Sequence, residues 1–351
     1  SIRFRKECVK NKASSRADIF LYLDTQFMKT LVTGAAGFIG YHTATRLLDR
    51  GDEVVGIDIV NDYYDVALKN ARLERLKAYK GFTFHKLDLS DRAAYDDTRR
   101  AIEGVTRTIH LAAQAGVRHS IEHPFDYVDA NLVAHMTILE LCRHQPNFHH
   151  LVYASSSSVY GGNTKLPFAI EDRVDSPVSL YAATKRANEH MSYSYAHLYG
   201  LPQTGLRFFT VYGPWGRPDM ALYIFADAIT NGRPIEVFNH GDMKRDFTYV
   251  DDIVTGVVAA HDNAPSTDPG PAHRVYNIGN HQSEPLMRMI SVLEDCLGKK
   301  AETIMKPMQM GDVKESFADI EAIRRDLGFE PTTSIDIGVP KFVEWFKEYN
   351  G

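Results

Sequence analysis

The chain has 351 residues, 44% of them hydrophobic, so it can bury a sizeable core, and its length suits two lobes better than one. A formal net charge of −5 gives no general attraction to nucleic acid or to an anionic membrane, since binding to either needs concentrated positive charge. The three cysteines, Cys8, Cys142 and Cys296, are too scattered for a disulfide framework or a thiolate metal site. We therefore expect a small-molecule partner, no metal and a reducing cytoplasm.

Residues 1–27 differ in character from the rest of the chain. They begin with the basic stretch "SIRFRKECVKNKASSR", and the apolar run "IFLYL" is far too short to span a bilayer or to form a signal core. Met28 then begins "MKTLVTG", which resembles a natural chain start. We interpret residues 1–27 as a leader or tag-like segment, the alternative being a genuine appendage, and leave them out of the predicted fold.

A strand, a glycine-rich turn and an amphipathic helix follow in that order from Lys29. The turn "GAAGFIG" joins the strand "KTLVTG" to the helix, and a second strand, "DEVVGID", ends in Asp58, 18 residues after Gly40. This is the context of a dinucleotide fingerprint. Gly34 permits the tight turn, Gly37 admits the pyrophosphate at the helix N-terminus, and Gly40 lets the helix pack closely.

The carboxylate of Asp58 indicates which dinucleotide binds. It accepts hydrogen bonds from both ribose hydroxyls and repels a 2′-phosphate, so NAD is favoured over NADP. Further strand-like runs, "FTFHKLDL", "RTIHLAA" and "HHLVYASSS", alternate with helical stretches, which predicts an α/β fold with a doubly wound parallel (Rossmann) sheet. Asp88 ends one of these strands, where we expect it either to face the adenine end or to cap the structure.

Tyr181 and Lys185 stand four residues apart in "YAATK". This spacing places them on one helix face but is also ordinary for exposed residues. Their helix follows a strand ending in "ASSSSVYG", which contains Ser156, and ligands collect at the carboxyl ends of parallel strands. Hydroxyl, phenol and ammonium form a proton-transfer set. The cation lowers the phenol pKa from about 10, and the phenolate accepts a hydroxyl proton as hydride leaves for nicotinamide.

The motifs "TGAAGFIG", "HLAAQAGVRHS", "SSSSVYG", "YAATK" and "RDFTYVDD" resemble those of extended short-chain dehydrogenase/reductases that act on nucleotide sugars. From about Met28 to the C-terminus, the chain is similar to UDP-glucuronate 4-epimerases. The resemblance implies tightly held NAD, a UDP-sugar in a smaller α/β C-terminal lobe, and Ser156, Tyr181 and Lys185 as the catalytic set. The expected NAD contacts are Gly34, Gly37, Phe38, Ile39, Gly40, Asp58, Asp88, Leu89, Ala112, Tyr181 and Lys185.

The side chains near the expected sugar limit which reactions the site can catalyse. Dehydrating relatives carry Asp-Glu before "VYG", whereas here Ser157 and Ser158 cannot act as general acids near neutral pH, so a 4-keto sugar has little to do except accept its hydride back. An arginine fork suits a substrate carboxylate. The resemblance assigns the substrate to a set of residues that extends into the C-terminal lobe, comprising Arg118, Ser157, Ser158, Thr210 at a strand end, Arg217 in the loop beyond, Arg245 at the diphosphate and Asp312 at the uridine ribose.

The expected organisation has two interleaved parts. Residues 28–205 form the NAD-binding domain, with return segments near 250–283, and residues 206–351 form the UDP-sugar lobe. Helical stretches around 127–144 and 180–199 retain apolar faces and resemble those that pair as a four-helix bundle, which predicts a homodimer.

The predicted activity is NAD-dependent 4-epimerisation of UDP-glucuronate to UDP-galacturonate through a transient 4-keto intermediate. The alternatives are a UDP-glucose 4-epimerase or a UDP-glucuronate decarboxylase, which product analysis separates, and a non-catalytic nucleotide-binding module, which any turnover would exclude.

Overall fold

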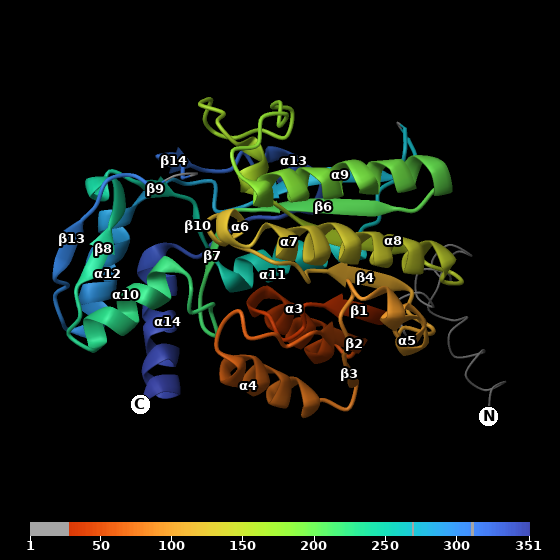
Figure 1. Ribbon diagram of the computed structural model, residues 1–351, viewed down its shortest axis with the longest axis horizontal. Helices are drawn as coiled ribbons and strands as arrows, with labels where there is room; N and C mark the ends of the chain where they lie inside the picture. The colour runs from red at the N-terminus through yellow and green to blue at the C-terminus, as the bar shows by residue number, and fades with distance from the viewer. Residues whose placement is uncertain (1–27, 269, 310–311) are drawn as a thin grey trace, which may run out of the picture.

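The computed structural model describes residues 28–268, 270–309 and 312–351, so the predicted leader, 1–27, lies outside the described residues. Figure 1 shows a large lobe around a long sheet and, beside it, a smaller lobe that contains α10 (Ala221–Thr230), α12 (Leu286–Leu297) and α14 (Ile335–Asn350). Among the described residues, no helix combines the length and the apolarity that crossing a membrane requires.

A parallel sheet of seven strands forms the centre of the large lobe within the described ranges. The strands are β1 (Lys29–Thr33), β2 (Glu53–Asp58), β3 (Phe82–Lys86), β4 (Arg107–His110), β5 (His150–Ser156), β6 (Gln203–Phe208) and β11 (His273–Ile278). They lie in the order β11-β6-β5-β4-β1-β2-β3, with every neighbouring pair parallel. The order reverses between β1 and β4, where doubly wound sheets form their binding crevice. The predicted sheet is confirmed.

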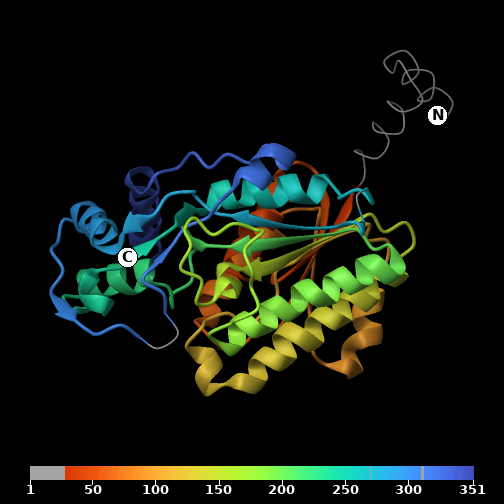
Figure 2. The same cartoon turned by 90° about the horizontal axis from the view of Figure 1, so that it is seen from above.

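Helices cover both faces of this sheet. They are α3 (Phe38–Asp49), α4 (Val66–Lys77), α5 (Tyr95–Ala101), α6 (His119–Glu122), α7 (Pro124–Tyr127), the π-helix η2 (Val128–Val133), α8 (Ala134–His144), α9 (Leu180–Tyr199), α11 (Val250–Asp262) and α13 (Glu321–Leu327), with 3-10 turns η1 (Arg92–Ala94) and η3 (Ser157–Tyr160). A further 3-10 turn, η4 (Phe238–Gly241), belongs to the small lobe. Figure 2 shows α8 and α9 on one face and α11 on the other.

Two apolar cores lie on the two faces, because successive strand side chains point to opposite sides. Leu31 packs in the core beneath α8 with Ile138, whereas the next residue, Val32, joins the core that includes Val254 of α11. This second core continues into the small lobe, where it includes Phe342. The two lobes therefore share one apolar interior.

The small lobe is built from short strands and helices, as predicted. Its strands are β7 (Thr210–Tyr212), β8 (Ile235–Val237), β9 (Lys244–Arg245), β10 (Phe247–Tyr249), β12 (Glu284–Pro285), β13 (Thr303–Met305) and β14 (Glu315–Ser316). β7 pairs with β10, β8 with β13, and β9 with both β12 and β14. Thr210, expected at a strand end, instead begins β7, because after Phe208 the chain leaves the large sheet and pairs with β10.

The close approach at Gly40 gives a testable prediction. A Cβ atom at Gly40 would lie 2.0 Å from the carbonyl oxygen of Gly34, so Gly40→Ala must displace backbone rather than a flexible side chain. We expect Gly40→Ala to lower the free energy of unfolding by roughly 2–4 kcal/mol, as other overpacked sites do, and to weaken NAD binding. Urea unfolding and NAD titration measure the two effects.

Gly162→Ala is the matched control for Gly40→Ala, because a Cβ atom at Gly162 meets only a side-chain carbon of Val178, at 3.9 Å. Equal unfolding free energies for the two variants would show that the close approach at Gly40 is not a constraint.

Candidate active site

A cleft of about 1340 Å³ lies between the large and small lobes at the carboxyl ends of the strands. Every residue that the sequence assigns to catalysis, cofactor or substrate lines this cleft, from Gly34 in the large lobe to Asp312 in the small one. The structure thus brings the whole predicted set together.

The glycine turn has the shape that a bound dinucleotide requires. Gly34 adopts a positive φ of 72°, and a Cβ atom there would lie 2.9 Å from the backbone nitrogen of Ala112. At Gly37 a Cβ atom would lie 2.9 Å from the Gly34 carbonyl oxygen. Gly37 is also the N-cap of α3 and makes no side-chain capping bond. The turn therefore offers a helix N-terminus that a phosphate can approach closely, and these residues fit NAD.

The two acidic residues of the cofactor half have different environments. Asp58 accepts hydrogen bonds from the backbone N–H groups of Ala36, at 3.0 Å, and Val60, at 2.7 Å. Burial raises the pKa of the Asp58 carboxyl, which the Val60 N–H group and the Lys69 charge oppose. Because each carboxylate oxygen has a second lone pair, Asp58 can still accept from ribose hydroxyls. Asp88 accepts from both the backbone N–H and the hydroxyl of Ser90, so it also stabilises a turn.

Helix α9 positions the Tyr181 and Lys185 pair. The side chain of Ser179 caps its N-terminus by accepting from the backbone N–H of Ala182, at 3.1 Å. One turn beyond Tyr181, the buried Lys185 donates from Nζ to the Ala154 carbonyl oxygen of β5, at 3.0 Å. The pair thus lies between α9 and the end of β5.

The serine run at the end of β5 divides its hydroxyls between two sets of partners. The Ser155 hydroxyl donates to the buried Glu189, at 2.7 Å. Ser156 lines the cleft, and its oxygen accepts from the hydroxyl of Ser158, at 2.9 Å. Ser157 also lines the cleft and begins η3. Ser156 and Ser158 are therefore one coupled pair of hydroxyls.

Burial and nearby charges act on both members of the Tyr181 and Lys185 pair. Burial raises the pKa of the Tyr181 phenol, and hydrogen bonding with Ser156 and the positive charge of Arg217 oppose this rise. Burial lowers the pKa of Lys185 to about 8. Arg217 is thus a cation near Tyr181 that the sequence did not indicate, and the expected effect of the Lys185 charge on Tyr181 stays a prediction.

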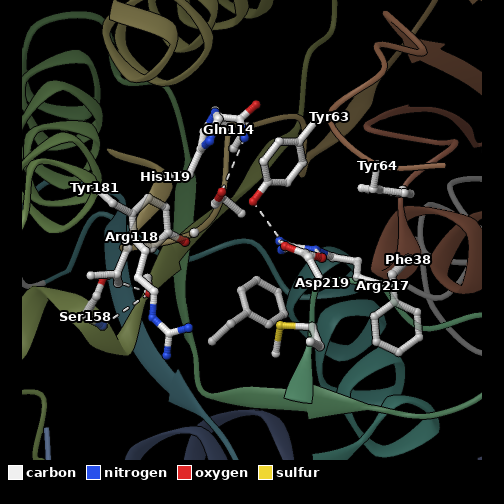
Figure 3. A pocket seen from close by; sticks show the side chains of 18 of the residues that line it. Phe38, Tyr63, Tyr64, Gln114, Arg118, His119, Ser158, Tyr181, Arg217 and Asp219 are labelled. Carbon is white, nitrogen blue, oxygen red and sulfur yellow. Dashed lines mark hydrogen bonds and ion pairs between the residues drawn. The ribbon is translucent and has the colours of Figure 1, made fainter. Parts of the chain in front are cut away.

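Arg217 is held in a chain of polar contacts that Figure 3 shows. Its Nε donates to Asp219 at 3.0 Å, and its Nη2 donates to the other oxygen of the same carboxylate. Tyr63, from the loop after β2, also donates to Asp219, at 3.1 Å. Because Asp219 takes one side of the guanidinium through Nε and Nη2, this ion pair does not use Nη1. Thr210 lines the same cleft.

The remaining predicted arginines make contacts near the cleft rim. The guanidinium of Arg118, from the large lobe, lies 5.1 Å from the ring centroid of Phe238 in the small lobe. Arg245 donates from Nη2 to Asp312, at 2.7 Å. The two residues expected at the diphosphate and at the uridine ribose therefore form an ion pair with each other.

Aromatic packing fixes the loop that precedes Arg217. Trp215 has a positive φ of 59°, and its ring lies 5.4 Å from Trp345 of α14 and 5.7 Å from Tyr41 of α3. The Tyr41 hydroxyl accepts from Arg75 Nε, at 2.9 Å. These contacts join the substrate-side loop to the helix that begins at the glycine turn.

Comparison with known proteins places this geometry in a family, since a family model described as NAD dependent epimerase/dehydratase family matches residues 30–279. The chain belongs to this family. Over 335 residues it is 49% identical to a probable UDP-glucuronate 4-epimerase of Rhizobium meliloti, covering 92% of this chain and 97% of that protein.

Solved structures agree with the family. UDP-glucuronic acid 4-epimerase from Bacillus cereus, in complex with UDP-glucuronic acid and NAD, is 34% identical, with a TM-score of 0.84 over 92% of this chain and 100% of that one. UDP-glucose 4-epimerase from Thermotoga maritima with UDP-glucose is 28% identical, with a TM-score of 0.82 and coverage of 92% and 100%.

Several residues of this epimerase/dehydratase site are not found by sequence reasoning. Asp219 and Tyr63 are 156 positions apart, and Arg72 is a fully buried cation between the glycine turn and the Trp215 loop. Asn131, inside the π-helix η2, holds the cleft wall by accepting from the backbone N–H of Gln114, at 2.8 Å. In the sequence, the only signal for Asn131 is that a polar residue stands between apolar ones in a predicted helix.

The buried charge of Lys185 is predicted to lower the free energy of unfolding at neutral pH. Burial moves its pKa from 10.5 to about 8, so below pH 8 the folded chain holds a buried charge. Linkage makes this cost about 3 kcal/mol, and it disappears as the pH rises towards the unfolded-state pKa. We expect Lys185→Met to be more stable than wild type at pH 7 by about 2 kcal/mol, since the hydrogen bond to Ala154 is also lost, and to lose this advantage near pH 10.5.

Urea unfolding at both pH values measures the effect of Lys185→Met. The control is Lys77→Met, at an exposed position on α4. If Lys185→Met and wild type keep the same stability difference across this range, the buried charge does not determine it.

Proposed function

We propose that this protein interconverts UDP-glucuronate and UDP-galacturonate with NAD bound in the cleft. The observation that carries the proposal is that Tyr181 and Ser156 line the same cleft as Arg217, whose charge acts on the phenol. A proton acceptor and a carboxylate-binding cation thus act on one bound sugar. The similarity to UDP-glucuronate 4-epimerases of Rhizobium meliloti and Bacillus cereus supports the same substrate.

In this proposal the chain's residues accept and return one proton while the sugar is oxidised and then reduced at C4. NAD, when bound, would supply the reversible hydride acceptor. Tyr181 takes the proton of the 4-hydroxyl and returns it after the keto sugar has turned, while Ser156 and Ser158 hold the oxygen. Lys185, fixed against Ala154, contributes to cofactor binding and to the proton balance of the site. Because Ser157 and Ser158 carry no acidic group, elimination of water has no general acid.

Recognition of the uronate carboxylate is assigned to Arg217, with Thr210 beside it. Asp219 occupies Nε and Nη2, which fixes the plane of the guanidinium and directs its Nη1 edge to a second carboxylate. Tyr63 secures Asp219 from the opposite wall. Asp219 is thereby proposed as the residue that orients Arg217 for a charged sugar.

The remaining residues of the cleft are assigned to the UDP part of the substrate and to NAD. Arg245 binds the diphosphate and Asp312 the uridine ribose, so their mutual ion pair opens when substrate enters. Arg118 closes over the sugar. NAD is held by the glycine turn, by Asp58 and Asp88, and by the apolar residues Phe38, Ile39, Leu89 and Ala112.

Three further assignments accompany this function. Residues 28–205, with return segments near 250–283, form the NAD-binding domain, and 206–351 form the sugar lobe. The chain forms a homodimer through η2, α8 and α9, which is supported by exposed apolar side chains such as Met136 of α8 and Leu198 of α9, at 38% and 66% exposure. The proposed compartment is the cytoplasm.

A UDP-glucose 4-epimerase is the second candidate. The observation that favours it is the Asp219 carboxylate, which neutralises Arg217, together with the similarity to the Thermotoga maritima enzyme. Substrate comparison separates the two candidates.

The proposed activity predicts a specific product. Purified protein incubated with UDP-glucuronate should form UDP-galacturonate without added NAD, and should turn over UDP-glucose much more slowly. Tyr181→Phe, which keeps the ring but removes the proton acceptor, should lower kcat by roughly two or more orders of magnitude. Chromatography of the nucleotide sugars measures both. Preferential turnover of UDP-glucose would favour the second candidate, and near-normal activity of Tyr181→Phe would contradict its assigned role.

The orienting role of Asp219 predicts a loss of selectivity. Asp219→Ala frees the Arg217 guanidinium to rotate, so the ratio of kcat/KM for UDP-glucuronate over UDP-glucose should fall about tenfold, equivalent to about 1.4 kcal/mol. Asp295→Ala, at an exposed position of α12, is the control. An unchanged ratio in Asp219→Ala would mean that Arg217 needs no orienting partner.

A further inference from the structure

Two histidines and an aspartate gather where the short helices α6 and α7 meet. The atoms with which His119, His123 and Asp126 could bind a metal all lie within 4.8 Å of one another. His119 Nε2 lies 3.5 Å from an Asp126 carboxylate oxygen, and the His119 and His123 rings stack with centroids 4.3 Å apart. No other group of three such residues was found in the described part of the chain.

A break in the helical path produces this convergence. Positions i, i+4 and i+7 share one face of a helix, but here the chain leaves the helical region at His123, with φ of −125° and ψ of 62°, and Pro124 begins α7. Ligands of a tetrahedral Zn²⁺ ion lie about 3.4 Å apart, given bonds of about 2.0–2.1 Å. The separation of His119 and Asp126 already matches this distance, and rotation of the exposed His123 ring completes the set.

The types of ligand select the ion. Two imidazoles and one carboxylate suit Zn²⁺ and similar transition-metal dications, whereas Mg²⁺ and Ca²⁺ prefer sets made only of oxygen. Three protein ligands leave a fourth position for water. The cluster lies at the cleft rim, because His119 and Asp126 line the cleft while His123 does not.

His119 belongs to the wall that the sugar must pass. Its ring lies 4.9 Å from Tyr63 and 6.0 Å from Tyr127, whose ring lies 6.0 Å from the Tyr181 ring. Figure 3 shows His119 with Tyr63, Arg118 and Tyr181 around the cleft. Arg118 immediately precedes His119 and contacts Phe238 in the other lobe, so a restraint on this segment also acts on Arg118.

We propose that His119, His123 and Asp126 form a Zn²⁺ site at the cleft rim, and that bound Zn²⁺ slows substrate entry by tying the segment that carries Arg118 to α7. Metal binding itself does not depend on the proposed function, whereas the slower entry does. A metal attached there restrains Arg118 without contacting the catalytic set, so the effect falls on KM rather than on kcat.

The test uses the full chain with Co²⁺ and Zn²⁺ as probes. We expect one equivalent of Co²⁺ to give the visible absorption of a tetrahedral site, and Zn²⁺ to displace it. Saturating Zn²⁺ should raise KM for UDP-glucuronate several-fold with little change in kcat, and a chelator should reverse this. His123→Gln should weaken metal binding roughly tenfold or more and remove the effect on KM.

His149→Gln is the matched control, because His149 is exposed just before β5, at the opposite end of the sheet from the cleft. Binding of Co²⁺ that is unchanged in His123→Gln would overturn the site. Binding that is lost in His123→Gln, together with a KM that Zn²⁺ does not alter in wild type, would overturn the effect on entry. If wild type does not turn over UDP-glucuronate, the proposed function fails, but the Co²⁺ spectrum still decides the site.

Discussion

The arrangement of the cleft depends on the buried guanidinium of Arg72. Its Nη1 donates to the Ala36 carbonyl oxygen in the glycine turn, at 2.8 Å, and its Nη2 donates to the Trp215 carbonyl oxygen, at 2.6 Å, two residues before Arg217. Arg72 is 0% exposed, and a buried charge is tolerated only where acceptors surround it. If the turn on the cofactor side and the loop on the sugar side separate, this buried cation therefore loses the carbonyl acceptors of one of them.

The base and the rim of the cleft consequently differ in character. At the base, Arg72 and a shared apolar core join the lobes permanently, since separating them would expose buried groups. At the rim, the lobes meet through a contact that a ligand can replace, that of Arg118 with Phe238. Substrate exchange can thus proceed by rearranging side chains at the rim, while the walls that position cofactor and sugar keep their separation.

Sequence reasoning found the features whose signals are local. The sheet follows from alternating strand and helix patterns, and the glycine turn and the spacing of Tyr181 and Lys185 are fixed by a few adjacent residues. It missed contacts between distant segments, such as that of Tyr63 with Asp219, because such contacts leave no periodic pattern in the sequence. It also missed that the charge of Arg217 acts on Tyr181, since the two residues are far apart in the sequence.

The packing of Trp215 against Trp345 has a practical consequence for following the cleft in solution. The sequence contains two tryptophans, and both lie in this one contact, two residues from the proposed carboxylate-binding arginine. The intrinsic emission of the protein therefore originates from the junction of the substrate loop with α14, and carries no background from tryptophans elsewhere. Displacement of that loop would change the stacking of both indoles, so stopped-flow fluorescence can time its movement in the unlabelled protein.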